Sequence, residues 1–343
     1  MSRARRSLIR CRLSGAWAAP HGCIPRLSRT PCSRQASSSS PRPADAWCIA
    51  AGAATLRPMN QLTYATCREA EIRSLFDTSG LCLEIGPSYN PILPKREGFR
   101  VETIDHADAD ELRKKYSAHL GVDISRIEDV DHVWRGEPLS ELVGCGRFDV
   151  VVASHVIEHT PDLLGFVKEC EKTLAPGGRL VLAVPDRRRC FDFFRPASTT
   201  GAVLQAHHEG RTRHAPGSAF DFIANFCTFD GRQGTGTKAA ESFTLSNPVT
   251  SAGRAFGKFA EAGDYRDCHG WVFTPSSFRL IASDLAAIGA TDLKEESFWE
   301  TPIFEFVTIL SQAAAGCPLD RASLLVAAHR EAAEPAAPQP GKN

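Results

Sequence analysis

The chain has 343 residues and carries 40 basic and 40 acidic side chains, so its formal net charge at neutral pH is zero, and 43% of its residues are apolar. This length allows one large domain or two small ones with a sizeable core. No apolar run reaches the roughly 18 residues that a membrane-spanning helix needs, so we expect no membrane interaction.

The first 58 residues differ in composition from the rest of the chain. They contain ten arginines, six prolines and the serine run 37–40, with Asp45 as the single acid and no periodic apolar pattern. An arginine-rich, acid-poor segment is typical of an organelle transit peptide; an over-extended start, with Met59 as the true initiator, is the alternative. We expect this segment to lie outside the folded domain.

The remainder of the chain is acidic. It holds 30 basic and 39 acidic residues, a net charge of −9, which makes it a poor partner for nucleic acid. Its eight cysteines are scattered and form no C-x-x-C pair, a pattern that indicates reduced thiols and a cytoplasmic location. The sequence does not predict an oligomeric state.

The first predicted elements form a βαβ-like unit. A helix over 62–77 leads into a short buried strand over 81–85, which ends at Gly86 and two prolines. A second strand over 99–105 ends in Asp105, nineteen residues after Gly86. This spacing is typical of folds in which a nucleoside lies across two strand ends and the acid binds its ribose hydroxyls.

Strands and helices then continue to alternate, which predicts a parallel sheet covered on both faces. The clearest helix covers 161–174, with Thr160 as its N-cap and Pro161 as its first residue. The other elements predicted in this part are a surface helix over 108–120, a strand over 129–134, a short helix over 138–143, and strands over 148–153 and 174–185.

The pattern breaks after Pro185. Residues 195–270 are rich in Gly, Thr, Ser and His, and we expect them to form an inserted lid between the core segments 59–194 and 271–312. Thr274 is predicted to cap a helix from Pro275 to Gly289. Strands over 293–300 and 303–310 read as a closing hairpin, and 313–343 as a final helix followed by a disordered tail.

Three motifs together carry a resemblance to a known family. They are Leu81-Cys-Leu-Glu-Ile-Gly-Pro-Ser-Tyr-Asn-Pro91, Phe148-Asp-Val-Val-Val-Ala-Ser-His-Val-Ile-Glu-His159 and Leu174-Ala-Pro-Gly-Gly-Arg-Leu-Val-Leu-Ala-Val-Pro185. The chain resembles the class I S-adenosylmethionine-dependent methyltransferases, in particular type 11-like domains that methylate small molecules. The resemblance implies an α/β fold with a doubly wound, mostly parallel, seven-stranded Rossmann-like sheet whose last strand is antiparallel.

The resemblance also implies S-adenosylmethionine as the cofactor. Where the family has G-x-G-x-G, this chain has Gly86-Pro-Ser-Tyr-Asn90, and we expect Asn90 to take the left-handed conformation that a missing glycine would provide. For the adenine side Asp129, Asp131 and Trp134 are all candidates. The predicted cofactor-binding residues are Glu84, Gly86, Pro87, Ser88, Asn90, Asp105, Asp131, Ser154 and His155.

Glu84 lies inside an apolar strand, where an unpaired carboxylate would cost several kcal/mol, so it needs a partner. In members of the family this position faces the methionine end of the cofactor; a purely structural hydrogen bond is the alternative.

The run His155-Val-Ile-Glu-His159 also fits the H-x-x-E-H pattern of inverted zinc peptidases. That chemistry needs both histidines on one long helix, whereas this run follows a strand and precedes Pro161, so we expect no metal here. As the loop after the fourth strand it would line the space between cofactor and acceptor. His159 is then the first candidate for a general base, and His269 the second.

The segment 185–194 leaves a strand end beside the cofactor loop and combines three arginines with three phenylalanines. We expect Arg187, Arg189 and Phe193 to contact the acceptor, since they supply anion-pairing donors and an apolar wall; a solvated loop is the alternative. The predicted function is methyl transfer to a small molecule. An inactive cofactor-binding protein and, less favoured because the glycine fingerprint is absent, a nicotinamide-dependent oxidoreductase are the alternatives.

Overall fold

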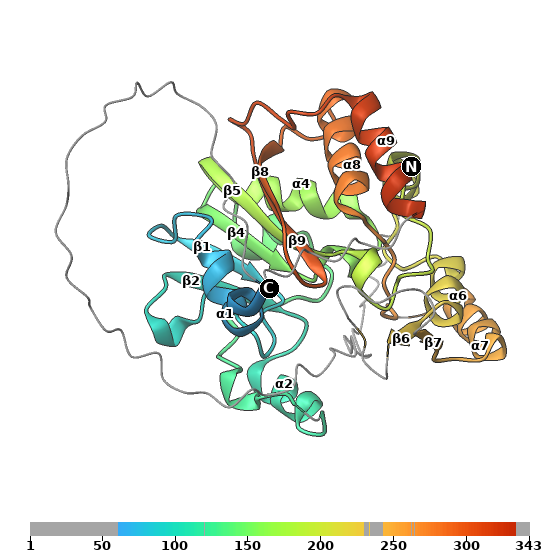
Figure 1. Ribbon diagram of the computed structural model, residues 1–343. Helices are drawn as coiled ribbons and strands as arrows, with labels where there is room; N and C mark the ends of the chain where they lie inside the picture. The colour runs from blue at the N-terminus through green and yellow to red at the C-terminus, as the bar shows by residue number, and fades with distance from the viewer. Residues whose placement is uncertain are drawn as a thin grey trace, which may run out of the picture.

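The computed structural model describes residues 61–333 except 120, 230–232, 234–242, 262 and 264. Its centre is a seven-stranded sheet with the strand order β3-β2-β1-β4-β5-β9-β8 (Figure 1). The strands are β1 Cys82–Ile85, β2 Val101–Asp105, β3 His132–Val133, β4 Phe148–Ser154, β5 Leu174–Pro185, β8 Lys294–Glu300 and β9 Glu305–Ser311. The strands from β3 to β5 pair in parallel, whereas β9 runs antiparallel to both of its neighbours. The predicted fold class is therefore confirmed.

Helices cover both faces of this sheet. Side chains of α3, α4, α5 and α8 pack on one face, and Ile72 of α1 packs on the other. The helices are α1 Gln61–Arg73, α2 Ala109–Tyr116, α3 Leu139–Val143, α4 Leu163–Thr173, α5 Thr200–His208, α6 Pro216–Ala224, α7 Val249–Ala260, α8 Pro275–Ala287 and α9 Arg321–Ala333. None of the helices described is long and apolar enough to cross a membrane.

Strand β4 shows why the central strands read as continuous apolar runs. Val150 and Val152 point to the α1 face, while Val151 and Ala153 point to the α4 face, and all four are buried. A strand that is covered on both sides has no solvent face, so its sequence cannot alternate between apolar and polar residues. Because β1 pairs in parallel with both β2 and β4, the carboxyl ends of these three strands lie at one edge of the sheet.

The start of α4 differs from the prediction. The helix begins at Leu163, and its N-cap is Asp162, whose side chain accepts a hydrogen bond from the Gly165 amide. The predicted cap, Thr160, instead donates its hydroxyl to the carbonyl of Ile157. The reason is a short 3-10 turn over Ile157–His159. Thr160 ends this turn, so the helix begins only after it.

Residues 195–270 contain more regular structure than their composition suggested. Helix α5 belongs to the layer on the sheet, because Val203 and Ala206 are fully buried in the main core. Helices α6 and α7 and the small antiparallel pair β6 Cys227–Phe229 and β7 Phe243–Leu245 lie to one side of the main sheet (Figure 1). Whether this side unit acts as a lid stays a prediction.

The last part of the chain follows the predicted order. Thr274 caps α8, and Ser277 completes a reciprocal capping box with it. The hairpin of β8 and β9 then closes the sheet, and α9 packs against α8. The predicted leader 1–58 and the predicted tail after Ala333 lie outside the described residues.

Candidate cofactor crevice and polar centre

A small pocket lies at the carboxyl ends of β1, β2 and β3. We call it the cofactor crevice; its lining residues are Ile85, Gly86, Ile104, Asp105, His106 and Trp134. Three of these side chains are apolar or aromatic, and Asp105 adds a carboxylate at the end of β2. An apolar wall beside an acid suits a nucleoside, whose base is flat and whose ribose presents hydroxyl groups.

The loop after β1 has the backbone geometry of a close approach to a ligand. Gly86 has φ +68°, and a Cβ there would lie 3.0 Å from Cγ2 of Val156. The second left-handed residue is Ser88, with φ +48°, and not Asn90 as expected from the sequence. Ser88 holds this strained conformation because its amide donates to Oδ2 of Asp105 at 3.0 Å. Strain of this kind gathers at functional sites.

Asp105 ties the loop to the end of β2. Its Oδ1 accepts from the amide of His106 at 2.7 Å and contacts Nδ1 of the same residue at 2.6 Å. Its Oδ2 accepts from Ser88. A carboxylate offers about four acceptor positions, so these contacts leave Asp105 one position for a ribose hydroxyl. The predicted ribose-binding role fits this geometry and stays a prediction.

Glu84 is 1% exposed and lies just before the crevice. Its two oxygens accept hydrogen bonds from the amides of Ile92 at 2.6 Å and Leu93 at 2.9 Å. Burial raises the pKa of Glu84 to about 7, although these two hydrogen bonds act in the opposite direction. Of the two roles that the sequence left open, the structural hydrogen bond is therefore observed.

The adenine candidates separate clearly. Asp131 forms an ion pair with Lys95 at 2.5 Å and accepts from the amide of Thr103 at 2.7 Å. Despite partial burial, these partners lower the pKa of Asp131. Trp134, not Asp131, lines the crevice. Asp131 thus links Lys95 to β2, and its direct contact with the cofactor stays a prediction.

Asn90 also faces a neighbour on the protein. Its side-chain oxygen accepts from Arg126 at 3.0 Å, and its amide donates to the carbonyl of Pro87 at 2.9 Å. Pro87 and Asn90 therefore shape the turn that follows β1. Direct contact of Pro87 or Asn90 with a cofactor stays a prediction.

Ser154 and His155, at the end of β4, belong to a buried ionic network. Arg68 of α1 donates to Ser154 Oγ at 2.7 Å and to both oxygens of Glu305 at 2.5 and 2.7 Å. Nε2 of His155 lies 2.8 Å from Glu305, and His155 has φ +54°. Arg68 and His155 outweigh the effect of burial and hold the pKa of Glu305 well below its usual range. The network fixes the loop that begins at His155.

A second cluster lies beyond that loop. We call it the polar centre; its members are Glu158, His159, Asp192, Asp267 and His269. Nδ1 of His159 lies 2.8 Å from Asp267, and Nδ1 of His269 lies 2.5 Å from Asp192. The two imidazole rings meet edge to face, with centroids 4.7 Å apart.

Backbone contacts bring the three segments of the polar centre together. The amide of Gly270 donates to the carbonyl of Glu158 at 2.7 Å, which places His269 beside the loop after β4. The hydroxyl of Tyr265 donates to the carbonyl of His159 at 2.8 Å. Arg195 then links the remaining segment, since it donates to Asp192 at 2.6 Å and to the carbonyl of His269 at 2.7 Å.

The electrostatics of the polar centre follow from burial and close charges. Burial alone would lower the pKa of His159, but Asp267, Glu158 and Asp192 together raise it to about 9. Burial alone would raise the pKa of Asp267 and of Asp192. The facing histidine lowers the pKa of each aspartate to about 2, with Arg195 adding to the effect at Asp192.

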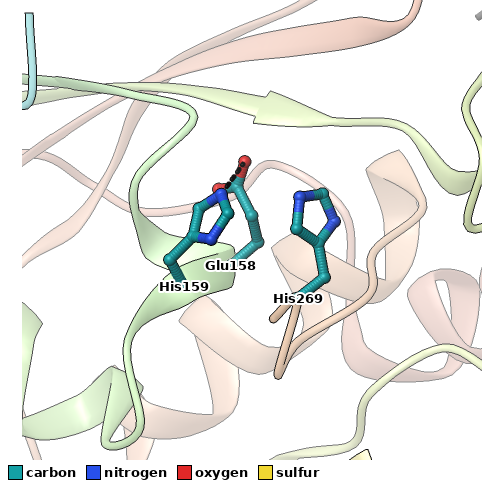
Figure 2. A group of neighbouring side chains, drawn as sticks. All are labelled: Glu158, His159 and His269. Atoms are coloured by element: carbon teal, nitrogen blue, oxygen red, sulfur yellow. Dashed lines mark ion pairs between the residues drawn. The ribbon is translucent and has the colours of Figure 1, made fainter. Parts of the chain in front are cut away.

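Glu158 lies beside the ring of His159, with His269 close by (Figure 2). It is 1% exposed, and neither carboxylate oxygen has a hydrogen-bond partner among the described residues. Its carboxylate lies 3.5 Å from a ring nitrogen of His155 and 3.9 Å from one of His159, both too far for hydrogen bonds. A buried carboxylate in this condition is costly unless a ligand compensates for it.

Aromatic rings wall the polar centre on the side of His269. The ring of Phe191 lies 4.8 Å from it and that of Phe222 lies 5.5 Å from it. Phe193, the phenylalanine chosen from the sequence, points elsewhere and packs against Phe229 and Phe243. Phe191 is therefore the better candidate for an apolar contact with an acceptor.

The two predicted arginines, Arg187 and Arg189, both donate hydrogen bonds to backbone carbonyls. Arg189 is 4% exposed and donates to the carbonyls of Thr301 and Ile303 in the turn between β8 and β9. Arg187 donates to the carbonyl of Phe193 at 2.8 Å. The solvated-loop reading does not describe Arg189, because its guanidinium is buried. The Nε atoms of Arg187 and Arg189 lack hydrogen-bond partners among the described residues, and contact of these arginines with the acceptor stays a prediction.

Sequence reasoning missed Glu158 as a functional group, and it missed the two aspartates that orient the histidines. Asp192 sits between the phenylalanines of the segment 185–194, and Asp267 precedes His269 by two residues. An acid close to a candidate histidine was the available signal. Spacing alone could not show which acid reaches which ring.

Comparison with known proteins identifies the family. A family model described as "Methyltransferase domain" matches residues 63–234, half of the chain. A ubiquinone biosynthesis O-methyltransferase from Caulobacter sp. (strain K31) is 32% identical over 95 residues, 27% of this chain and 34% of that protein. One from Bradyrhizobium sp. (strain ORS 278) is 30% identical over 138 residues, 37% of this chain and 51% of that protein. The matches thus span about a third to a half of these relatives.

Solved structures give a weaker likeness. A SAM-dependent methyltransferase from Aquifex aeolicus is 10% identical with a TM-score of 0.38, and the match covers 73% of this chain and 93% of that one. The CcbJ methyltransferase from Streptomyces caelestis is 17% identical with a TM-score of 0.37, over 72% and 89% of the two chains.

Proposed function

Because this chain belongs to the methyltransferase domain family, we propose that it transfers the methyl group of S-adenosylmethionine to a small-molecule acceptor. The observation that carries the proposal is the cofactor crevice, where Gly86, Asp105 and Trp134 meet at the ends of three parallel strands. In open α/β sheets, ligands bind at this edge.

The residues of the crevice fit the adenosine part of the cofactor. Ile104 and Trp134 offer apolar surface to the base, and Asp105 keeps one acceptor position for the ribose. Gly86 lets the backbone come close to the ligand. The bound cofactor would supply a methyl group on a sulfonium, which is already a good leaving group, so the protein has mainly to align the acceptor.

We place the acceptor at the polar centre. Val156, which contacts the position of a Cβ on Gly86, is two residues from Glu158, so the crevice and the centre adjoin. Lys115 is influenced by charges from both sites. Burial lowers its pKa to about 8, and Asp105 of the crevice and Asp267 of the polar centre both oppose that shift. His159 and His269 are the groups that we propose act on the acceptor, with Phe191 as its apolar contact.

The ubiquinone biosynthesis enzymes among the relatives are O-methyltransferases by name. We therefore propose an acceptor that presents an oxygen nucleophile. The eight cysteines within the described residues are all unbonded, which supports a reducing compartment such as the cytoplasm.

The test is calorimetric titration of the full chain with S-adenosylmethionine, followed by transfer of a labelled methyl group to a panel of phenols, catechols and hydroxy acids. Asp105→Asn should weaken cofactor binding by about 1.5 to 3 kcal/mol, the range for a hydrogen bond to a charged group. Glu102→Gln is the matched control, because Glu102 lies on the same strand and pairs with His132 and Arg147. Binding without turnover of any acceptor would favour an inactive cofactor-binding protein, and no binding would refute the proposal.

A further inference from the structure

Three groups in the polar centre are arranged as metal ligands. One carboxylate oxygen of Glu158 and one ring nitrogen each of His159 and His269 lie within 4.8 Å of one another, and all three residues are buried. Figure 2 shows the three side chains together, with the carboxylate of Glu158 next to the ring of His159. Zinc bonds of about 2.1 Å would bring such atoms to within about 3.5 Å of each other, a closure that side-chain rotations can supply.

The condition of Glu158 is an independent observation. Both of its oxygens are buried and lack hydrogen-bond partners among the described residues, although two imidazoles stand close by. A carboxylate that only stabilised a charged histidine would be expected to hydrogen-bond it, yet its distance to His159 is 3.9 Å. A cation bound by all three groups would supply the partner that this carboxylate lacks.

The two aspartates complete the pattern. Metal-binding histidines usually donate their second ring nitrogen to a carboxylate, which fixes the tautomer and the ring orientation. Here Asp267 lies 2.8 Å from Nδ1 of His159 and Asp192 lies 2.5 Å from Nδ1 of His269, so Nε2 is the nitrogen of each ring that a metal ion would take. Arg195 holds Asp192 in turn. Each of the two histidines is thus oriented by one aspartate.

We propose that Glu158, His159 and His269 bind one divalent transition-metal ion. Two imidazoles and one carboxylate select Zn²⁺, Fe²⁺ or a similar ion over Mg²⁺ and Ca²⁺, which prefer oxygen ligands. The site differs from the H-x-x-E-H motif considered above. His155 belongs to the Glu305 network, and the second histidine comes from residue 269.

Three protein ligands leave positions open on the ion, as in catalytic metal sites. An acceptor with a hydroxyl, phenol or carboxylate oxygen fits such a position. The histidines would then act as ligands, and the base roles expected from the sequence would fall away. This use of the ion rests on the proposed function, whereas metal binding itself does not.

The experiment uses the untagged full chain, stripped of metal by dialysis against a chelator. ZnCl₂ is titrated calorimetrically, and CoCl₂ is followed by its visible absorption bands. We expect one ion per chain and at least a hundredfold weaker zinc binding by Glu158→Gln and by His269→Gln. Asp192→Asn should weaken binding about 10- to 100-fold. His132→Gln is the matched control, since His132 on β3 pairs with Glu102 on β2 and belongs to no part of the polar centre.

The wild-type titration decides the proposal even where a variant fails to fold. No stoichiometric uptake of zinc or cobalt would overturn it, as would Glu158→Gln binding zinc as tightly as the wild type. S-adenosylhomocysteine is titrated into the same stripped protein. Cofactor binding without metal uptake would refute only this inference, and metal uptake without cofactor binding would refute only the proposed function.

Discussion

The cofactor crevice is shaped by a backbone turn and by side chains at neighbouring strand ends, whereas the polar centre is built from side chains of three separate segments. In the crevice, left-handed residues at 86 and 88 and the amide of Ser88 set the shape around Asp105. In the centre, ionisable groups hold one another in place, with Asp192, both histidines and Arg195 buried. A shape set by the backbone tolerates changes of nearby side chains, whereas a network of buried charges depends on each of its members.

Glu305→Gln should have the largest effect, because both regions depend on the end of β4. The change removes the charge that holds Arg68 and His155, and breaking a buried pair costs about 3 to 5 kcal/mol. Urea unfolding monitored by circular dichroism measures the loss. Glu296→Gln, which removes a more exposed ion pair with Arg179 on the same sheet, should change stability by less than about 1 kcal/mol.

The pH dependence of this effect has a definite sign. The folded-state pKa of Glu305 is lowered, so its stabilising contribution is complete above the unfolded value of about 4.3 and declines as the pH falls below it. The difference between wild type and Glu305→Gln should therefore shrink between pH 7 and pH 3. A constant difference over that range would contradict the assignment of the network.

The two regions also differ in how far the sequence predicts them. The strand ends, Gly86 and Asp105 are close in sequence, and apolar runs with turn residues mark them, so the fold and the crevice follow from local patterns. Ser88 was not predicted as the second left-handed residue, because its conformation depends on a hydrogen bond to Asp105 across the strand end. To predict the site residues one therefore needs the register of β1 and β2, which the sequence pattern alone does not supply.

The polar centre was only partly predictable for the same reason. His159 and His269 were chosen from their positions, but the pairing with Asp267 and Asp192 is set by how the chain returns after α7. Arg189 shows the same limit: an arginine next to a strand end looked exposed in the sequence, yet it is buried and its Nη1 donates to two backbone carbonyls. Sequence can nominate charged residues, but only packing decides which partner each one meets.

Gly86→Ala should separate the crevice from the polar centre. A side chain at φ +68° costs about 1 to 2 kcal/mol, and the new Cβ would press on Val156. We expect weaker binding of S-adenosylhomocysteine with unchanged zinc affinity, both by calorimetry. Gly98→Ala is the matched control, because Gly98 also has positive φ but no atom lies near its added Cβ. Equal losses of cofactor affinity in both variants would show that general strain, not the crevice, is responsible.

Thr274→Ala should have the smallest effect and touch neither region. It removes the capping box of α8 and should lower stability by about 1 kcal/mol, measured as a shift in thermal unfolding. Binding of cofactor and of zinc should be the same as in the wild type at temperatures below the transition. A selective loss of either ligand would show that α8 is coupled to the site.

A crystal structure of the full chain with S-adenosylhomocysteine tests the central claim most directly. The account predicts that the ribose contacts the remaining acceptor position of Asp105, that the adenine lies beside Ile104 and Trp134, and that the sulfur points toward the polar centre. A ligand bound with its adenosine elsewhere, or with its sulfur directed away from Glu158, His159 and His269, would contradict it.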